Sequence, residues 1–163
     1  MAKISAEQPL MPSILDRLLD DDPGVSRDPT RSRSQVLREV KASIRRDLED
    51  LLNTRRRCRP IPAGLDELEH SLAAYGLPDV AGARFGSSEG RERFRELLES
   101  VVRRWEPRFK TVKVLLLDPP EQTDRVVRFR IDALMHADPA PEPVIFDSQA
   151  EPTTGGFEVR GVA

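Results

Sequence analysis

Glu106, Pro107 and Arg108 have the clearest chemical potential, because they place a carboxylate, a ring and a guanidinium in consecutive positions. The apolar pattern before them predicts that Glu106 lies at the last turn of a helix, and the residue before a proline leaves the helical region. A carboxylate there faces the negative end of the helix dipole, which is mildly unfavourable. We therefore expect Glu106 to pair with a cation, either within this chain or on another molecule.

Paired carboxylates are the one enzymatic chemistry that the sequence offers. Glu96, Glu99 and Glu106 lie on or beside one predicted helix, and a glycosidase needs an acid of raised pKa with a second carboxylate about 5 to 9.5 Å away. Four arginines crowd these glutamates: Arg95, Arg103, Arg104 and Arg108. Nearby cations lower a carboxyl pKa, which is wrong for a general acid. The only Tyr and Trp, Tyr75 and Trp105, are predicted core residues, so the aromatic side chains of a sugar cleft are missing.

Metal and cofactor chemistry is not indicated. The chain has two histidines, His70 on a predicted helix and His136 on a predicted strand, and one cysteine, so clustered zinc ligands are not expected. No Gly-rich phosphate loop follows a predicted strand. The cysteine, Cys58, lies in the basic stretch Arg55–Arg59, where cations would lower its thiol pKa. A reactive thiol and a bystander in a basic loop both remain open.

Length and composition indicate one domain with a tail. The chain has 163 residues, of which 38% are apolar and 33% charged, and its net charge of -2 gives no global nucleic-acid footprint. The longest apolar run, Val114–Leu117, is too short to span a bilayer, and no apolar segment of signal length precedes Asp16. We therefore expect a cytoplasmic protein with no direct membrane insertion.

Residues 1–33 are predicted to be a flexible arm, because their mixture of Pro, Asp, Arg and Ser cannot bury much apolar surface. Within the arm, Ser13–Leu19 has a helix-capping serine and an apolar stripe formed by Ile14, Leu15, Leu18 and Leu19. This short amphipathic element could dock on the protein's own domain or on a partner. Residues 34–163 are predicted to form a single domain.

Three helices are predicted in the first half of that domain. The first follows a cap at Ser34 and has one apolar face: Val36, Leu37, Val40, Ile44, Leu48, Leu51 and Leu52. The second runs from about Leu65, places Leu65, Leu68, Leu72 and Tyr75 on one face, and stops at Gly76. The third runs from about Ser88 to Trp105. These spacings of three and four residues are typical of helices with one apolar face.

After Pro107 the apolar period changes from 3.6 to 2, which predicts strands. The expected strands are a first over Thr111–Leu116, a long second over Arg125–His136, a short third over Val144–Phe146 and a fourth over Phe157–Arg160. The alternation is that of an antiparallel sheet with one wet face. Helices first and strands second predict an α+β fold, with N-terminal helices packed on a small antiparallel or mixed sheet formed by the C-terminal half.

Three segments in one order connect the chain to a known family: Leu51–Arg56 (LLNTRR), Tyr75–Asp79 (YGLPD) and Trp105–Arg108 (WEPR). The similarity extends to Ser13–Leu19, Pro143–Asp147 and Thr154–Val159. On these segments the chain resembles the TssE family of type VI secretion system baseplate subunits, which belongs with the lysozyme-like baseplate wedge proteins of contractile phage tails. One departure is Ala73–Ala74 before Tyr75, where the family would have Leu-Asn.

The resemblance implies a structural, non-enzymatic role. Such a protein joins the baseplate wedge complex to the first ring of the contractile sheath, promotes sheath assembly, and works in a baseplate docked at the inner-membrane complex. The implied partners are the baseplate subunits TssF, TssG and TssK and the sheath subunits TssB and TssC, without nucleic acid or cofactor. The alternative from a different class is a peptidoglycan-cleaving, lysozyme-like hydrolase.

Nine residues are the candidates for partner binding: Glu106, Pro107, Arg108, Ile14, Leu15, Leu18, Phe157, Glu158 and Val159. The first three match the family, and the arm contributes an apolar stripe. The last three lie on a short terminal strand whose edge could receive a partner's strand by main-chain hydrogen bonding. The alternative for that strand is a closed sheet, in which Phe157 and Val159 merely cover the core.

Overall fold

The computed structural model describes residues 13–18, 24, 32–58, 62, 64–80, 87–117, 126–137, 140–151 and 154–162. The helices are α1 (Ile14–Leu18), α2 (Arg33–Asn53), α3 (Asp66–Glu69), the 3-10 helix η1 (Leu72–Ala74) and α4 (Ser88–Trp105). The strands follow: β1 (Phe109–Leu116), β2 (Val127–Met135), β3 (Glu142–Glu151) and β4 (Gly156–Val162). Helices precede strands, so the predicted α+β class is confirmed.

The four strands form one antiparallel sheet in the order β1-β2-β3-β4, which makes β1 and β4 its edges. The long predicted strand is therefore central: Ile131 of β2 pairs with Val114 on one side and Phe146 on the other. Buried and outward residues alternate along β2 and β3, as the sequence period of 2 predicts, while β1 has a bulge between Phe109 and Thr111.

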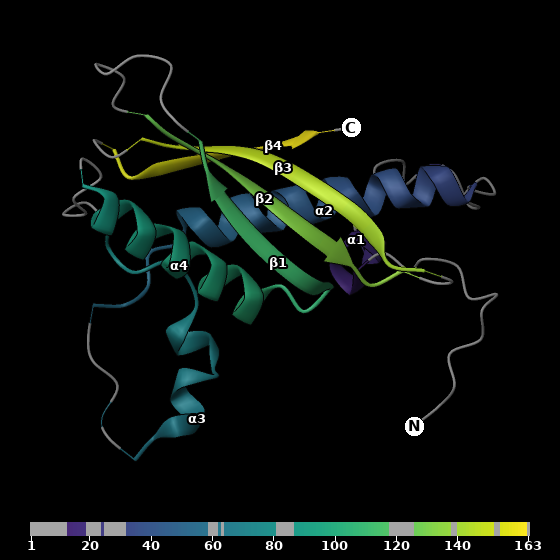
Figure 1. The fold of residues 1–163 in the computed structure, drawn as a ribbon. Coiled ribbons are helices and arrows are strands. Elements are labelled where there is room, and N and C mark those ends of the chain that lie inside the picture. Colours follow the sequence, from purple (N-terminus) through teal and green to yellow (C-terminus); the bar gives the residue numbers. More distant parts are fainter. Residues whose placement is uncertain are drawn as a thin grey trace.

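Both long helices cover the same face of the sheet (Figure 1), with α2 against β4 and α4 against β1. Their apolar stripes and the inward face of the sheet form one core, in which Ile44, Leu98 and Phe129 are fully buried. The opposite face carries polar pairs, such as Arg130 Nε with Asp147 Oδ1 at 2.7 Å. Among the described helices, none is long and apolar enough to cross a membrane.

The cap of helix α2 lies two residues before the one that the sequence suggested. Its cap is Ser32, not Ser34: Ser32 Oγ accepts from the Gln35 amide, and the Gln35 side chain accepts from the Ser32 amide at 2.7 Å. This reciprocal arrangement satisfies two amides that the first turn leaves without partners. The Ser-x-x-Gln spacing at 32–35 was the available signal, and the prediction of Ser34 overlooked it.

The predicted second helix is broken into α3 and η1. The break is at Ser71, whose backbone is extended. Its side chain caps η1 by accepting a hydrogen bond from the Ala73 amide, and its hydroxyl donates to the Leu68 carbonyl. Serine competes for backbone groups in this way and disfavours a continuous helix. Of the predicted apolar face, Leu65, Leu68 and Leu72 are consequently exposed, and Tyr75 packs against the core.

Strand β3 is ten residues long, whereas the sequence suggested only Val144–Phe146. The alternation continues through Ser148 and Ala150, which are buried, while Asp147 and Gln149 face outward. Small side chains at the inward positions carry little hydropathy signal, and this explains why the strand was predicted too short.

Candidate interaction site

The Glu106–Arg108 turn joins α4 to β1, and Glu106 is only 4% exposed. Its amide donates to the Val102 carbonyl, and its backbone (φ -112°, ψ 82°) leaves the helical region, as expected before a proline. The carboxylate accepts from Arg108 Nε at 2.6 Å and from Arg108 Nη2 at 2.5 Å. The cation that Glu106 needs is thus supplied two residues later in the same chain, by a bidentate pair across the exposed Pro107.

Arg108 also reaches across to α2. Its Nη2 lies 2.6 Å from Asp47 Oδ2, and its Nη1 donates weakly to Ser43 Oγ at 3.4 Å. Burial works against the cation, but the hydrogen bonds and charges of Glu106 and Asp47 outweigh it and raise the pKa of Arg108 above its ordinary value. Arg108 therefore holds the start of β1 against α2.

The same flank of α2 anchors α1. Asp16 accepts at 2.7 Å from Arg46 Nη2 and at 2.6 Å from Ser43 Oγ, and Ser13 Oγ also donates to it at 2.6 Å. Burial raises the pKa of Asp16, but these three hydrogen bonds and the Arg46 charge lower it by more, to well below the ordinary value. The carboxylate is therefore ionised at any physiological pH.

Arg46 Nη2 also lies 3.3 Å from Asp47 Oδ1, which links the two clusters into one network. We call this network, Asp16–Arg46–Asp47–Arg108–Glu106, the turn network; it joins α1, α2 and the end of α4. Ser43, Arg46 and Asp47 were not among the sequence candidates. They lie on one flank of the α2 apolar stripe, but the periodicity could not tell what faces that flank.

The described apolar side chains of α1 are Leu15 and Leu18. Leu15 is 58% exposed and Leu18 is 75% exposed, although Asp16 between them is held on α2. The side chain of Ile14 lies outside the described part of the structure. Asp16 therefore anchors the helix to α2, while the two predicted partner-binding residues Leu15 and Leu18 are largely exposed.

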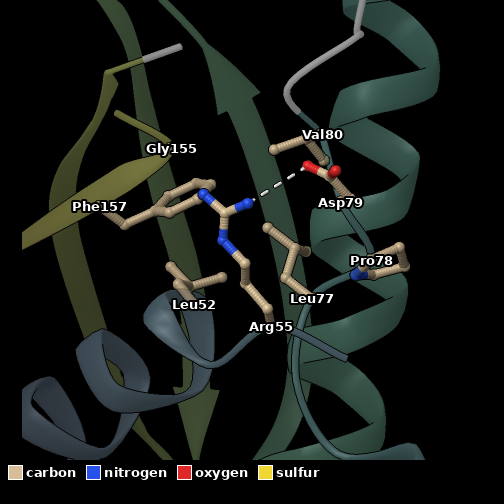
Figure 2. A pocket seen from close by; sticks show the side chains of 8 residues that line it. All are labelled: Leu52, Arg55, Leu77, Pro78, Asp79, Val80, Gly155 and Phe157. Carbon is tan, nitrogen blue, oxygen red and sulfur yellow. Dashed lines mark ion pairs between the residues drawn. The ribbon is translucent and has the colours of Figure 1, made fainter. Parts of the chain in front are cut away.

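Three of the family-like segments meet at the other end of α2 (Figure 2). Arg55 forms a parallel bridge with Leu77: the Leu77 amide donates to the Thr54 carbonyl and the Arg56 amide to the Leu77 carbonyl, both at 2.8 Å. Gly76 has φ +101° and its α-carbon faces the Thr54 carbonyl, so a side chain there would lie 2.4 Å from that oxygen. Only glycine fits this turn without strain.

The Arg55 side chain crosses this junction and points its guanidinium at Asp79 (Figure 2), at 3.6 Å. It also donates to the Thr154 carbonyl in the β3–β4 turn, at 3.3 Å. The cavity among these residues measures about 10 Å³, roughly the space of a single water. The junction is therefore a packing contact between segments rather than a ligand site.

Strand β4 is tied to α2 along its outer edge. The Asn53 side chain accepts from the Phe157 amide at 2.9 Å and donates to the Phe157 carbonyl at 2.8 Å, and Arg45 donates to the Val159 carbonyl at 3.1 Å. Phe157 and Val159 are core residues, while Glu158 faces the open side and bonds to Gln149 and Arg160. Asn53 and Arg45 were not candidates from the sequence.

The opposite edge is protected in the same manner by α4. Arg103 donates to the Val112 carbonyl of β1, and the Val114 amide donates to the Glu99 carboxylate, each at 3.3 Å. Polar side chains from a flanking helix thus occupy edge groups of both β1 and β4. Covered edges prevent uncontrolled strand pairing.

The glutamates considered for hydrolysis have cationic partners. Glu99 lies 2.9 Å from Arg95 and 2.7 Å from Arg103, and Glu106 is held by Arg108. Tyr75 and Trp105 are half-buried and stack edge to face at 5.3 Å. No group of His, Cys, Asp and Glu in the described part of the chain is arranged to hold a metal ion.

Comparison with known proteins places the chain in a family. No curated protein is significantly similar to it in sequence. Among solved structures it is similar to a chain of the baseplate complex from the type VI secretion system, at 18% identity and a TM-score of 0.47, covering 77% of this chain and 96% of that one. The sequence profile of baseplate wedge protein gp25 matches residues 38–140, which include most of α2, the Glu106–Arg108 turn, β1 and β2. Since this match covers more than half of the chain, the protein belongs to the gp25 family of baseplate wedge proteins.

Proposed function

We propose that this protein is a structural subunit of a type VI secretion baseplate, which joins the wedge subunits TssF and TssG to the first ring of the contractile sheath. Family membership supports the baseplate role. The proposal assigns no catalysis, because each glutamate considered for hydrolysis is bound by arginine.

The wedge contact is proposed at the turn network and α1. Glu106 is buried and positions Arg108, whereas Pro107 is exposed and Arg108 is half-buried. The exposed Leu15 and Leu18 lie on α1, which the same network anchors. In this arrangement Glu106 acts as a positioning residue, and Pro107, Arg108, Leu15 and Leu18 form the contact surface, with Ile14 on the same helix.

The sheath contact is proposed at the β4 edge near Gly161, and one observation carries it. A groove of about 510 Å³ opens there between α2 and β3, lined by Arg38, Lys41 and Arg45, by β3 residues 143–146 and by Gly161. Beyond the Ile145–Val162 pair, no described strand continues the sheet on this side of β3. An extended acidic segment of a sheath subunit could enter this groove, pair with the outward edge of β4 at Gly161 and meet the cations of α2.

The strand alternation selects the variant that tests this contact. Because the Phe157 amide and carbonyl face outward to Asn53, alternation directs the Glu158 amide to β3 and the Gly161 amide outward. Proline at Glu158 would therefore break the monomer's own sheet. Proline at Gly161 removes only an outward donor, and a β-carbon there meets open space.

Sheath assembly from purified baseplates is the measurement. Gly161→Pro is expected to abolish sheath growth while its melting temperature stays within about 3 °C of the wild type, the shift expected for about 1 kcal/mol. Gly161→Ala is the matched control and should assemble normally. Normal sheath growth with Gly161→Pro would contradict the proposed edge.

A further inference from the structure

The segment Leu65–Leu72, which comprises α3 and the start of η1, projects away from the sheet and the long helices (Figure 1). Three leucines in it are exposed: Leu65 by 48%, Leu68 by 38% and Leu72 by 82%. Large apolar side chains that gather on a protein surface mark an interaction site more often than isolated ones do. In this structure the rest of the described chain leaves them largely uncovered.

The base of the segment is nevertheless held firmly. Tyr75 stacks edge to face on Trp105, with ring centroids 5.3 Å apart, and Arg104 donates to the Glu69 carbonyl. Ala74 and Leu77, which follow the segment, are buried in the body of the protein. The leucines are therefore presented on an element that is fixed from below.

The segment also lies in an acidic stretch. From Pro60 to Ala83 the sequence has four acidic residues, Asp66, Glu67, Glu69 and Asp79, and neither Lys nor Arg. The charge of the whole chain is nearly balanced, with 26 basic and 28 acidic residues, so the excess of acidic residues is a local property of this stretch. Glu67 and Glu69 are exposed, and neither carboxylate forms an ion pair with a described residue.

We propose that Leu65, Leu68 and Leu72 dock an amphipathic helix of a neighbouring baseplate protein, which bears aliphatic side chains on its contacting face and Lys or Arg on its flanks. An exposed apolar patch rimmed by charge marks an interaction site, and an amphipathic helix presents the aliphatic stripe that such a patch can bury. The exposed carboxylates of Glu67 and Glu69 favour basic flanks on the partner, because complementary charge steers association and rejects acidic competitors. The inference rests on the proposed function in one respect, which is that the partner is sought among baseplate proteins.

Site-specific photo-crosslinking in the assembled baseplate tests the proposal. Leu72 is replaced by p-benzoylphenylalanine, and the matched control carries the same replacement at Leu134, which is exposed on the open face of the sheet. The Leu72 probe is expected to capture one partner segment with helical aliphatic spacing and basic flanks, at about tenfold the yield of the Leu134 probe.

The outcomes separate the two proposals. A chain that enters the assembly but gives no crosslink above the control, or that captures an acidic segment or a second copy of itself, overturns this inference and leaves the proposed function standing. Wild-type protein that never enters the assembly overturns both.

Binding of the captured segment, made as a synthetic peptide, gives the energetic test. The pair of changes Leu68→Ser and Leu72→Ser is expected to weaken binding about tenfold, which is about 1.4 kcal/mol, while Leu134→Ser leaves it unchanged. Glu67→Lys with Glu69→Lys should weaken binding most at low salt, since salt screens exposed charges. Unchanged affinity in the double serine variant would overturn the proposal.

Discussion

At the scale of single residues, the Glu106–Arg108 pair explains why a carboxylate stands at the negative end of α4. Pro107 turns the chain so that a guanidinium two residues later binds Glu106 through two contacts of 2.5 and 2.6 Å. A buried carboxylate without such a partner would be strongly disfavoured. The sequence predicted the need for a cation, but it left open which molecule supplies it, because that depends on the conformation of the turn.

Asp16 leads to a prediction about pH. Its pKa is depressed in the folded state, so its contribution to docking α1 is complete above the unfolded pKa of about 3.9 and is lost as pH falls through the folded value. The backbone amide shifts of residues 13–18 should therefore stay constant from pH 7 to about pH 4 and move only in stronger acid. Asp16→Asn should show the detached shifts already at pH 7.

Asp147→Asn is the control for this titration, because Asp147 pairs with Arg130 on the open face of the sheet and does not contact α1. Amide shifts of α1 that are the same in Asp16→Asn and in the wild type would show that Asp16 does not hold this helix.

At the scale of elements, the ends of helices were harder to predict than their existence. The apolar stripes of α2 and α4 were evident, since each places buried residues every three or four positions. The stripe of Leu65, Leu68 and Leu72 had the same spacing but lies outside the core, because Ser71 interrupts the helix by capping η1. Periodicity reports an apolar face and cannot tell whether its cover belongs to the same chain.

The turn after η1 gives a prediction about stability. Gly76 and Gly64 both have positive φ, +101° and +87°, but only Gly76 faces a backbone oxygen, that of Thr54, which would lie 2.4 Å from an added β-carbon. Gly64→Ala should lower the free energy of unfolding by about 1 kcal/mol, which is the strain of a left-handed backbone at a residue with a β-carbon. Gly76→Ala should cost at least twice as much, because the bridge between Arg55 and Leu77 must shift as well.

Thermal unfolding of the two variants measures the difference, with about 2 to 4 °C of melting temperature expected for each kcal/mol. Equal losses for Gly64→Ala and Gly76→Ala would mean that the close approach of Gly76 to Thr54 contributes nothing to the fold.

At the scale of the whole molecule, α2 connects the two proposed contacts. One flank, with Ser43, Arg46 and Asp47, faces the turn network and α1. The other flank, with Arg38, Lys41 and Arg45, lines the groove beside β4. One helix thus contributes to both the proposed wedge surface and the proposed sheath surface, which suits a structural adaptor.

The α+β fold class could be predicted from the order of the hydrophobic patterns, because helical periods come before strand periods in the sequence. The assignment of α4 to the β1 edge and α2 to the β4 edge did not, because it depends on contacts between residues far apart in the sequence, such as Asn53 with Phe157. The convergence of the LLNTRR, YGLPD and TGGFEV segments at Arg55 was also invisible in the linear sequence, since nothing in their composition shows that they meet.

Co-purification with TssF and TssG tests the central claim most directly. The wild type and the control Arg130→Ala, which removes an exposed ion pair of similar geometry, should both co-elute with these subunits. Arg108→Ala should melt about 4 to 8 °C lower, for a loss of about 2 kcal/mol, remain folded at about 20 °C, and fail to co-elute. Wild-type protein that does not associate with TssF and TssG, or folded Arg108→Ala that binds them as the wild type does, would contradict the account.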